Sequence, residues 1–114
     1  MKTENIAKES IEKLEWKGML FDFYGELLTE HQKKIYENAI FDDLSLSEIA
    51  AEQGISRQGV HDILKHCDKI LAEYENKLHL VERFAKIKQM VQEINTLTDD
   101  EKIKKLSDEI IEEL

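Results

Sequence analysis

The sequence predicts an all-α fold, in which a helix-turn-helix domain is followed by a C-terminal helical extension. Proline is absent and glycine occurs four times in 114 residues, whereas Glu, Lys, Leu and Ile, which favour helices or are neutral toward them, are abundant. Apolar residues recur at helical spacing in several segments. A chain of this length suits one domain with its own core. We therefore expect a helical domain at residues 1–78 and an extension at residues 79–114 that could serve in dimerisation.

The first part of the chain should hold two helical segments. The aromatic and apolar residues gathered at 16–28 are typical of a core. Thr29, with Gln32 three residues later, forms a capping box that starts a new helix. This helix should run to Ile40, and the acidic pair at 42–43 should end it without proline or glycine.

A helix-turn-helix is expected between Leu46 and Cys67. Either Ser45 or Ser47 can cap a short first helix, and Ser56 can cap the second. A three-residue turn that contains glycine joins the two helices, which is the arrangement of this motif. The residues that should form its core, crossing, turn and cap are Ile49, Ala50, Gly54, Ile55, Ser56, Val60 and Ile63.

The spacing within this stretch is specific. With Leu46 as the first position, the small residue Ala50 stands fifth and lets the helices cross closely, and Gly54 stands ninth, where it accepts a positive φ. Gln53 is a departure, because the eighth position is usually apolar. The alternative is an ordinary helical hairpin with a glycine turn.

The second helix of the motif offers hydrogen-bond donors near its N-terminus, where a nucleic-acid reader would need them. Arg and Gln side chains can each form two hydrogen bonds, to guanine and adenine edges respectively. The candidate nucleic-acid-binding residues are Arg57, Gln58, His61 and Lys65. Against this interpretation, Asp62 and Asp68 lie on or near the same helix, and an ordinary solvated face would look similar.

The net charge argues against a nucleic-acid partner. The chain carries a formal charge of -9 at pH 7, which repels phosphate. Residues 55–78 hold four positive and four negative groups, whereas residues 29–54 hold two and six. The balanced segment is the one with the candidate contacts. The acidic segment would suit a basic protein partner.

An amphipathic segment follows the motif. No helix breaker occurs between Arg57 and Asn76, and the helix could continue to Asn95. Within it an apolar seam repeats over about two heptads, fewer than a free coiled coil needs. The seam residues, which we expect to mediate self-association as a homodimer, are Leu80, Phe84, Ile87, Val91 and Ile94. The alternative is that the last helix folds back and covers this seam.

The last helix should begin near Thr98, which would cap it with Glu101 at the third position. Its apolar residues recur at helical spacing, so they should share one face. They are Ile103, Leu106, Ile110 and Leu114.

The sequence favours neither catalysis nor metal binding. The four histidines include no pair at i, i+4 spacing, and the single cysteine, Cys67, is interpreted as a buried structural thiol. The acidic pairs at 42–43 and 99–100 lie at helix breaks, where carboxylates serve as caps. We expect no enzyme, no cofactor and no metal ion.

A cytoplasmic location and no membrane insertion are expected. No apolar run approaches the ~20 residues that span a bilayer, and the first residues lack the apolar segment of a secretory signal. A single cysteine also fits a reducing compartment.

Three stretches carry a family pattern: Met19–Thr29, Leu46–Val60 and Ala72–His79. Together they resemble the YlxM family of small bacterial proteins, over about residues 15–85. The resemblance implies a helix-turn-helix similar to region four of sigma factors. It also implies a role in the signal recognition particle pathway, because the family's genes lie beside that of the particle's GTPase. Gly59 departs from the pattern, since related sequences more often have alanine there.

Two functions follow as expectations. The first is a regulatory or accessory protein of the signal recognition particle pathway, whose helix-turn-helix contacts DNA or the particle's RNA. The alternative is a protein interaction module that binds the particle's GTPase or a polymerase without nucleic acid.

Overall fold

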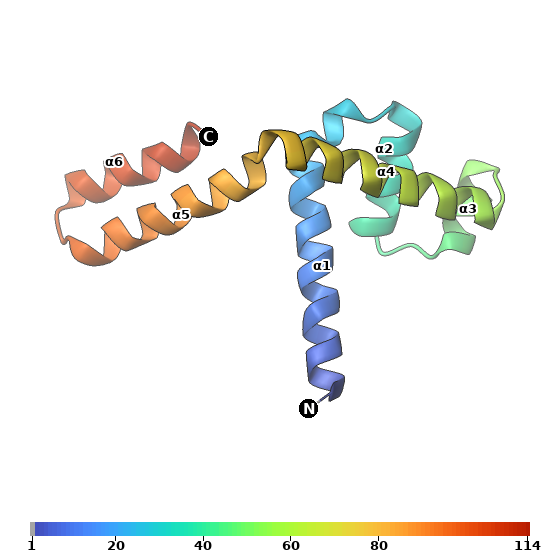
Figure 1. The fold of residues 1–114 in the computed structure, drawn as a ribbon, viewed down its shortest axis with the longest axis horizontal. Coiled ribbons are helices and arrows are strands. Elements are labelled where there is room, and N and C mark those ends of the chain that lie inside the picture. Colours follow the sequence, from blue (N-terminus) through green and yellow to red (C-terminus); the bar gives the residue numbers. More distant parts are fainter. Residues whose placement is uncertain (1) are drawn as a thin grey trace. The chain divides into compact units, whose positions relative to one another are not determined.

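The computed structural model describes residues 2–114, and side chains from residue 12 onward. The described chain is helical and has no strand, so the predicted all-α class is confirmed (Figure 1). It divides into two compact units, Met1–Leu78 and His79–Leu114. The elements are α1 (Lys2–Tyr24), the short 3-10 helix η1 (Gly25–Leu27), α2 (Glu30–Ile40), α3 (Leu46–Gln53), α4 (Arg57–Leu78), α5 (Leu80–Leu97) and α6 (Glu101–Glu112).

The central helix of the first unit is α4, because α1, α2 and α3 all pack against it (Figure 1). Ile35, Ile49 and Val60 form a fully buried cluster that joins α2, α3 and α4. A second group of fully buried side chains comes from α1, α2 and α4, namely Tyr24, Tyr36, Cys67 and Leu71. Three neighbours therefore fix the position of α4.

Only part of the aromatic segment at 16–28 belongs to the core. Leu20 and Tyr24 are buried, whereas Trp16 and Leu27 are exposed. The expectation that this cluster as a whole is core is wrong in part, because α1 buries one face and leaves the other in solvent, and Leu27 lies beyond α1 in the short helix η1.

Polar side chains also tie α4 to α1 and α2. The Tyr24 hydroxyl donates to the buried carboxylate of Glu75, with 2.6 Å between the oxygens, and the Tyr36 hydroxyl donates to Asp68 at 2.9 Å. Lys17 Nζ lies 3.2 Å from the other oxygen of Asp68. Burial raises the pKa of Tyr36, and the Asp68 carboxylate raises it further. Tyr36 therefore remains a hydrogen-bond donor at neutral pH.

The structure decides one helix boundary that the sequence left open, and it corrects another. The helices α4 and α5 are separate, because His79 between them has a left-handed backbone with φ 56°. The cap of α6 is Asp100, whose side chain accepts from the backbone N–H of Lys102 at 2.9 Å. Thr98 instead accepts a hydrogen bond from the N–H of Asp100 at 3.1 Å. The expected cap at Thr98 is therefore wrong by two residues.

The second unit is an antiparallel hairpin of α5 and α6 (Figure 1). The last helix folds back onto α5, which is the alternative considered for the apolar seam. On this seam Val91 is buried, Phe84, Ile87 and Ile94 are half-buried, and Leu80 is exposed. The seam is therefore less accessible for self-association than the sequence indicated.

Candidate nucleic-acid interface

The helix-turn-helix consists of α3, a turn at 54–56 and α4. The Ser45 hydroxyl accepts from the N–H of Glu48 at 3.1 Å, and the Ser45 N–H donates to the Glu48 carboxylate at 3.2 Å. This reciprocal pair makes Ser45 the cap of α3, not Ser47. Gly54 ends α3 with φ 67°, a conformation that side-chain-bearing residues rarely adopt.

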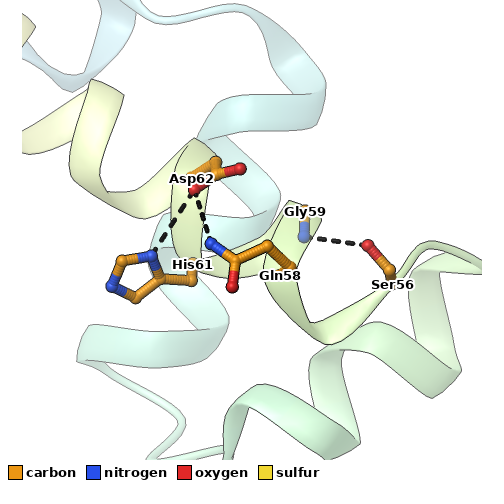
Figure 2. A network of polar contacts seen from close by, with 5 residues as sticks. All are labelled: Ser56, Gln58, Gly59, His61 and Asp62. Carbon is orange, nitrogen blue, oxygen red and sulfur yellow. Dashed lines mark hydrogen bonds and ion pairs between the residues drawn. The ribbon is translucent and has the colours of Figure 1, made fainter.

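Ser56 caps α4 as predicted. Its hydroxyl accepts a hydrogen bond from the backbone N–H of Gly59 at 2.9 Å (Figure 2). A Cβ at Gly59 would lie 3.1 Å from the Ser56 hydroxyl oxygen. An alanine at this position would therefore press on the cap while it improved the helix propensity.

The seven residues predicted to build the motif lie where α3 meets α4. Ile49 and Val60 are fully buried. Ala50, Ile55 and Ile63 pack against that pair and are partly buried. Gly54 and Ser56 stand in the exposed turn. The motif thus supplies a rigid base for the outer face of α4.

The four predicted contact residues share that outer face, and all are exposed. Arg57, His61 and Lys65 follow one another at four-residue steps, so they form a row along the helix, with Gln58 beside it. Lys69, which is exposed one turn further, extends the row. Sequence reasoning missed Lys69, although the same four-residue step indicates it.

Asp62 engages two of the four candidates. Gln58 Nε2 donates to Asp62 Oδ1 at 2.9 Å, and His61 Nδ1 lies 3.5 Å from the same oxygen (Figure 2). The i, i+4 spacing of Gln58 and Asp62 is the sequence signal for this contact. The carboxylate therefore holds a donor that would otherwise be available to a base edge.

Features for other chemistry are sparse. Among the described residues, no three His, Cys, Asp or Glu side chains are placed to hold a metal ion. Cys67 is buried, and this burial raises its pKa to about 11, so the thiol is protonated and a poor nucleophile at neutral pH. In the part of the chain that the structure describes, every helix is too short or too polar to cross a membrane.

Comparison with known proteins identifies the family. The model of the YlxM / p13 like helix-turn-helix family, UPF0122, matches residues 11–110. The chain belongs to the UPF0122 family. The predicted YlxM resemblance is therefore confirmed, and the match extends past residue 85, where the resemblance in the sequence ended.

Individual UPF0122 proteins are similar over most of their length. A relative from Halalkalibacterium halodurans is 45% identical over 80 residues, which cover 70% of this chain and 73% of the relative. One from Streptococcus gordonii is 45% identical over 84 residues, covering 74% and 76%. One from Bacillus thuringiensis is 41% identical over 91 residues, covering 80% and 83%. The names of these relatives state the family and no activity.

Proposed function

We propose that this UPF0122 protein binds nucleic acid, either DNA or the RNA of the signal recognition particle, through the outer face of α4. The observation that carries the proposal is the exposed row of Arg57, His61 and Lys65, with Gln58 beside it. In a helix-turn-helix, the N-terminal part of the second helix is the part that reaches base edges. Arg and Gln at that position match guanine and adenine.

The charge of the protein limits the strength of such binding. The formal charge of -9 repels phosphate, and the face offers few cations. Affinity should therefore be low and should rest on a small number of phosphate contacts. Weak binding suits an accessory protein that acts beside a larger complex, because a second contact within that complex raises the effective concentration.

We place this role in the signal recognition particle pathway on the strength of the YlxM resemblance. The protein would act there as a regulatory or accessory factor and not as an enzyme. The protonated, buried thiol of Cys67 is consistent with a structural role for the one cysteine.

A second candidate function is a protein interaction module without nucleic-acid binding. Two observations favour it: Asp62 holds the side chain of Gln58, and α3 carries the exposed acidic residues Glu48 and Glu52 next to α4. A basic partner surface, for example on the particle's GTPase, would complement these carboxylates.

A titration separates the two functions. Labelled duplex DNA and the targeting-particle RNA are titrated at low salt with the wild type and with the Arg57→Ala/Lys65→Ala variant. The matched control is Lys13→Ala/Lys34→Ala, which removes two exposed cations from α1 and α2. We expect the first variant to lose most of the affinity while helicity by circular dichroism is unchanged, and the control to bind as wild type does.

The opposite results would favour the protein module. If the wild type binds neither nucleic acid, or if the two double variants bind alike, the α4 face does not read nucleic acid. A pull-down from lysate with and without nuclease then shows whether a protein partner is retained after nuclease treatment.

A further inference from the structure

We propose that Asp62 is a positioning residue for base recognition: it orients the side-chain amide of Gln58 so that this amide binds the N6 and N7 edge of adenine. This inference rests on the proposed function of the α4 face and names the base that the face recognises. Gln58 is the second residue of α4, and the first residues of such a helix are the ones that reach base edges. Asp62 lies one turn further along the same helix.

The contact between these two residues distinguishes the two ends of the Gln58 amide. Nε2 donates to Asp62 Oδ1 at 2.9 Å, and Oε1 points away from the carboxylate (Figure 2). An ionised carboxylate accepts hydrogen bonds and donates none, so a reversed amide would place two acceptors against each other. Asp62 therefore selects one of the two orientations of the amide before a base is bound.

The atoms of Gln58 that remain available match adenine. An amide nitrogen has two N–H groups, and the one opposite Oε1 faces Asp62. The other N–H lies beside Oε1, so a donor and an acceptor stand next to each other on the exposed edge. Adenine offers an N6–H donor and the N7 acceptor, which fit this pair, whereas guanine offers two acceptors and would set O6 against Oε1.

Gln58 is the closest donor to Asp62 among its charged and polar neighbours on α4. His61 Nδ1 is 3.5 Å from the same oxygen, which is longer than a well-formed N–H···O bond. In the part of the chain that the structure describes, no lysine or arginine lies within ion-pair distance of this carboxylate. Gln–Asp pairs at i, i+4 spacing form stabilising hydrogen bonds on helix surfaces. The carboxylate is thus free to hold the amide.

Asp62 should affect affinity and selectivity in opposite directions. Its charge repels phosphate, so it lowers the affinity for every nucleic acid. Its hydrogen bond restricts the Gln58 side chain before binding, so less conformational freedom is lost when the amide meets adenine. Removal of Asp62 should therefore tighten binding while it weakens the preference for adenine. A residue that acted by charge alone would change the affinity and leave the preference as it was.

Replacement of adenine by 7-deazaadenine measures this preference, because the analogue has C–H in place of N7 and still forms Watson–Crick pairs. Fluorescence titrations at low salt compare a duplex DNA of A·T pairs, and the targeting-particle RNA, each made with adenine or with the analogue. We expect wild type to bind the adenine form about fivefold more tightly, because the analogue lacks one of two hydrogen bonds. Asp62→Ala should bind both forms more tightly and reduce this ratio to less than about twofold. An effect in one titration series alone identifies DNA or RNA as the source of the adenine.

Three further variants separate positioning from charge. Glu73→Ala removes an exposed carboxylate further along α4 and should leave the ratio unchanged, and Asp62→Glu, which keeps the acceptor, should preserve most of it. Gln58→Ala should abolish the ratio. Asp62→Ala added to Gln58→Ala should change the affinity without any further change in the ratio, since Asp62 acts through Gln58.

Two kinds of failure are distinguishable. If wild type binds neither nucleic acid, the proposed function of the α4 face is wrong and this inference is wrong with it. If wild type binds but does not distinguish adenine from the analogue, or if Asp62→Ala keeps the wild-type ratio, the inference alone is overturned. An Asp62→Ala substitution that changes the ratio equally in the Gln58→Ala variant would show that Asp62 contacts the base itself, which also overturns it.

Discussion

The Ser56 hydroxyl satisfies one free backbone amide at the start of α4, and this bond fixes the register of every exposed residue on the candidate interface. Ser56→Ala should lower the free energy of unfolding by ~1 kcal/mol, because the amide of Gly59 loses its acceptor. Urea unfolding measures the change. Ser47→Ala is the matched control, since Ser47 is exposed in α3 and is not its cap. Equal effects of the two substitutions would mean that α4 is not capped by Ser56.

Asp62 should restrain nucleic-acid binding by its charge and by its contact with Gln58. Asp62→Ala removes both, so the variant should bind duplex DNA or the particle RNA more tightly than wild type at low salt. Glu73→Ala removes one exposed carboxylate further along α4 and serves as the charge control. Fluorescence titration measures both affinities. An Asp62 variant that binds no more tightly than the Glu73 variant would contradict a local role for this residue.

The buried thiol of Cys67 makes stability depend on alkaline pH. Burial raises the pKa of this thiol in the folded protein from its ordinary value of 9.0 to about 11. Below the lower value both states are protonated, so the thiol adds no pH dependence there. As the pH rises from there to the folded pKa, the unfolded chain ionises first and folding stability falls. We expect Cys67→Ala to flatten this decline in urea unfolding measured at successive pH values, and a decline of unchanged slope would contradict the assignment.

At the scale of helices, the sequence predicts where a helix begins when a serine or threonine hydroxyl caps it. It misses the helix boundaries that have no such hydroxyl cap. The capping box of Thr29 and Gln32 is present, and Ser56 caps α4. The sequence places a domain boundary at residues 78–79 but does not show that the helix breaks there, because a histidine with positive φ has no local signature of the kind that glycine or proline provides. At α6, Thr98 and Asp100 are both good caps, and only the structure decides between them.

The break at His79 can be tested by the sign of one substitution. Glycine adopts positive φ freely, so His79→Gly should leave the free energy of unfolding unchanged or raise it by up to ~1 kcal/mol. In a continuous helix the same substitution would lower it by ~1 kcal/mol. Urea unfolding distinguishes the two cases. A clear loss of stability together with a loss of helical circular dichroism would show that α4 and α5 form one helix.

At the scale of the whole molecule, the position of the candidate interface follows from the sequence, whereas one of its contacts and one feature of α6 do not. The motif spacing and the local charge balance indicate the outer face of α4, where Arg57 and Lys65 are exposed. The engagement of Gln58 by Asp62 depends on side-chain conformations, which spacing alone does not determine. The exposure of the apolar residues of α6, namely Ile103, Leu106, Ile110 and Leu114, depends on which side of α6 meets α5, and the sequence left both sides available.

The salt dependence of nucleic-acid binding tests the central claim most directly, because each phosphate contact on duplex DNA contributes ~0.9 to the slope of log affinity against log salt concentration. For the wild type we predict a shallow slope that corresponds to a few contacts. Lys65→Ala should reduce this slope by about 1, whereas Lys34→Ala, on α2, should leave it unchanged. A slope that is the same for wild type and Lys65→Ala, or no measurable binding by the wild type at low salt, would contradict nucleic-acid binding through α4.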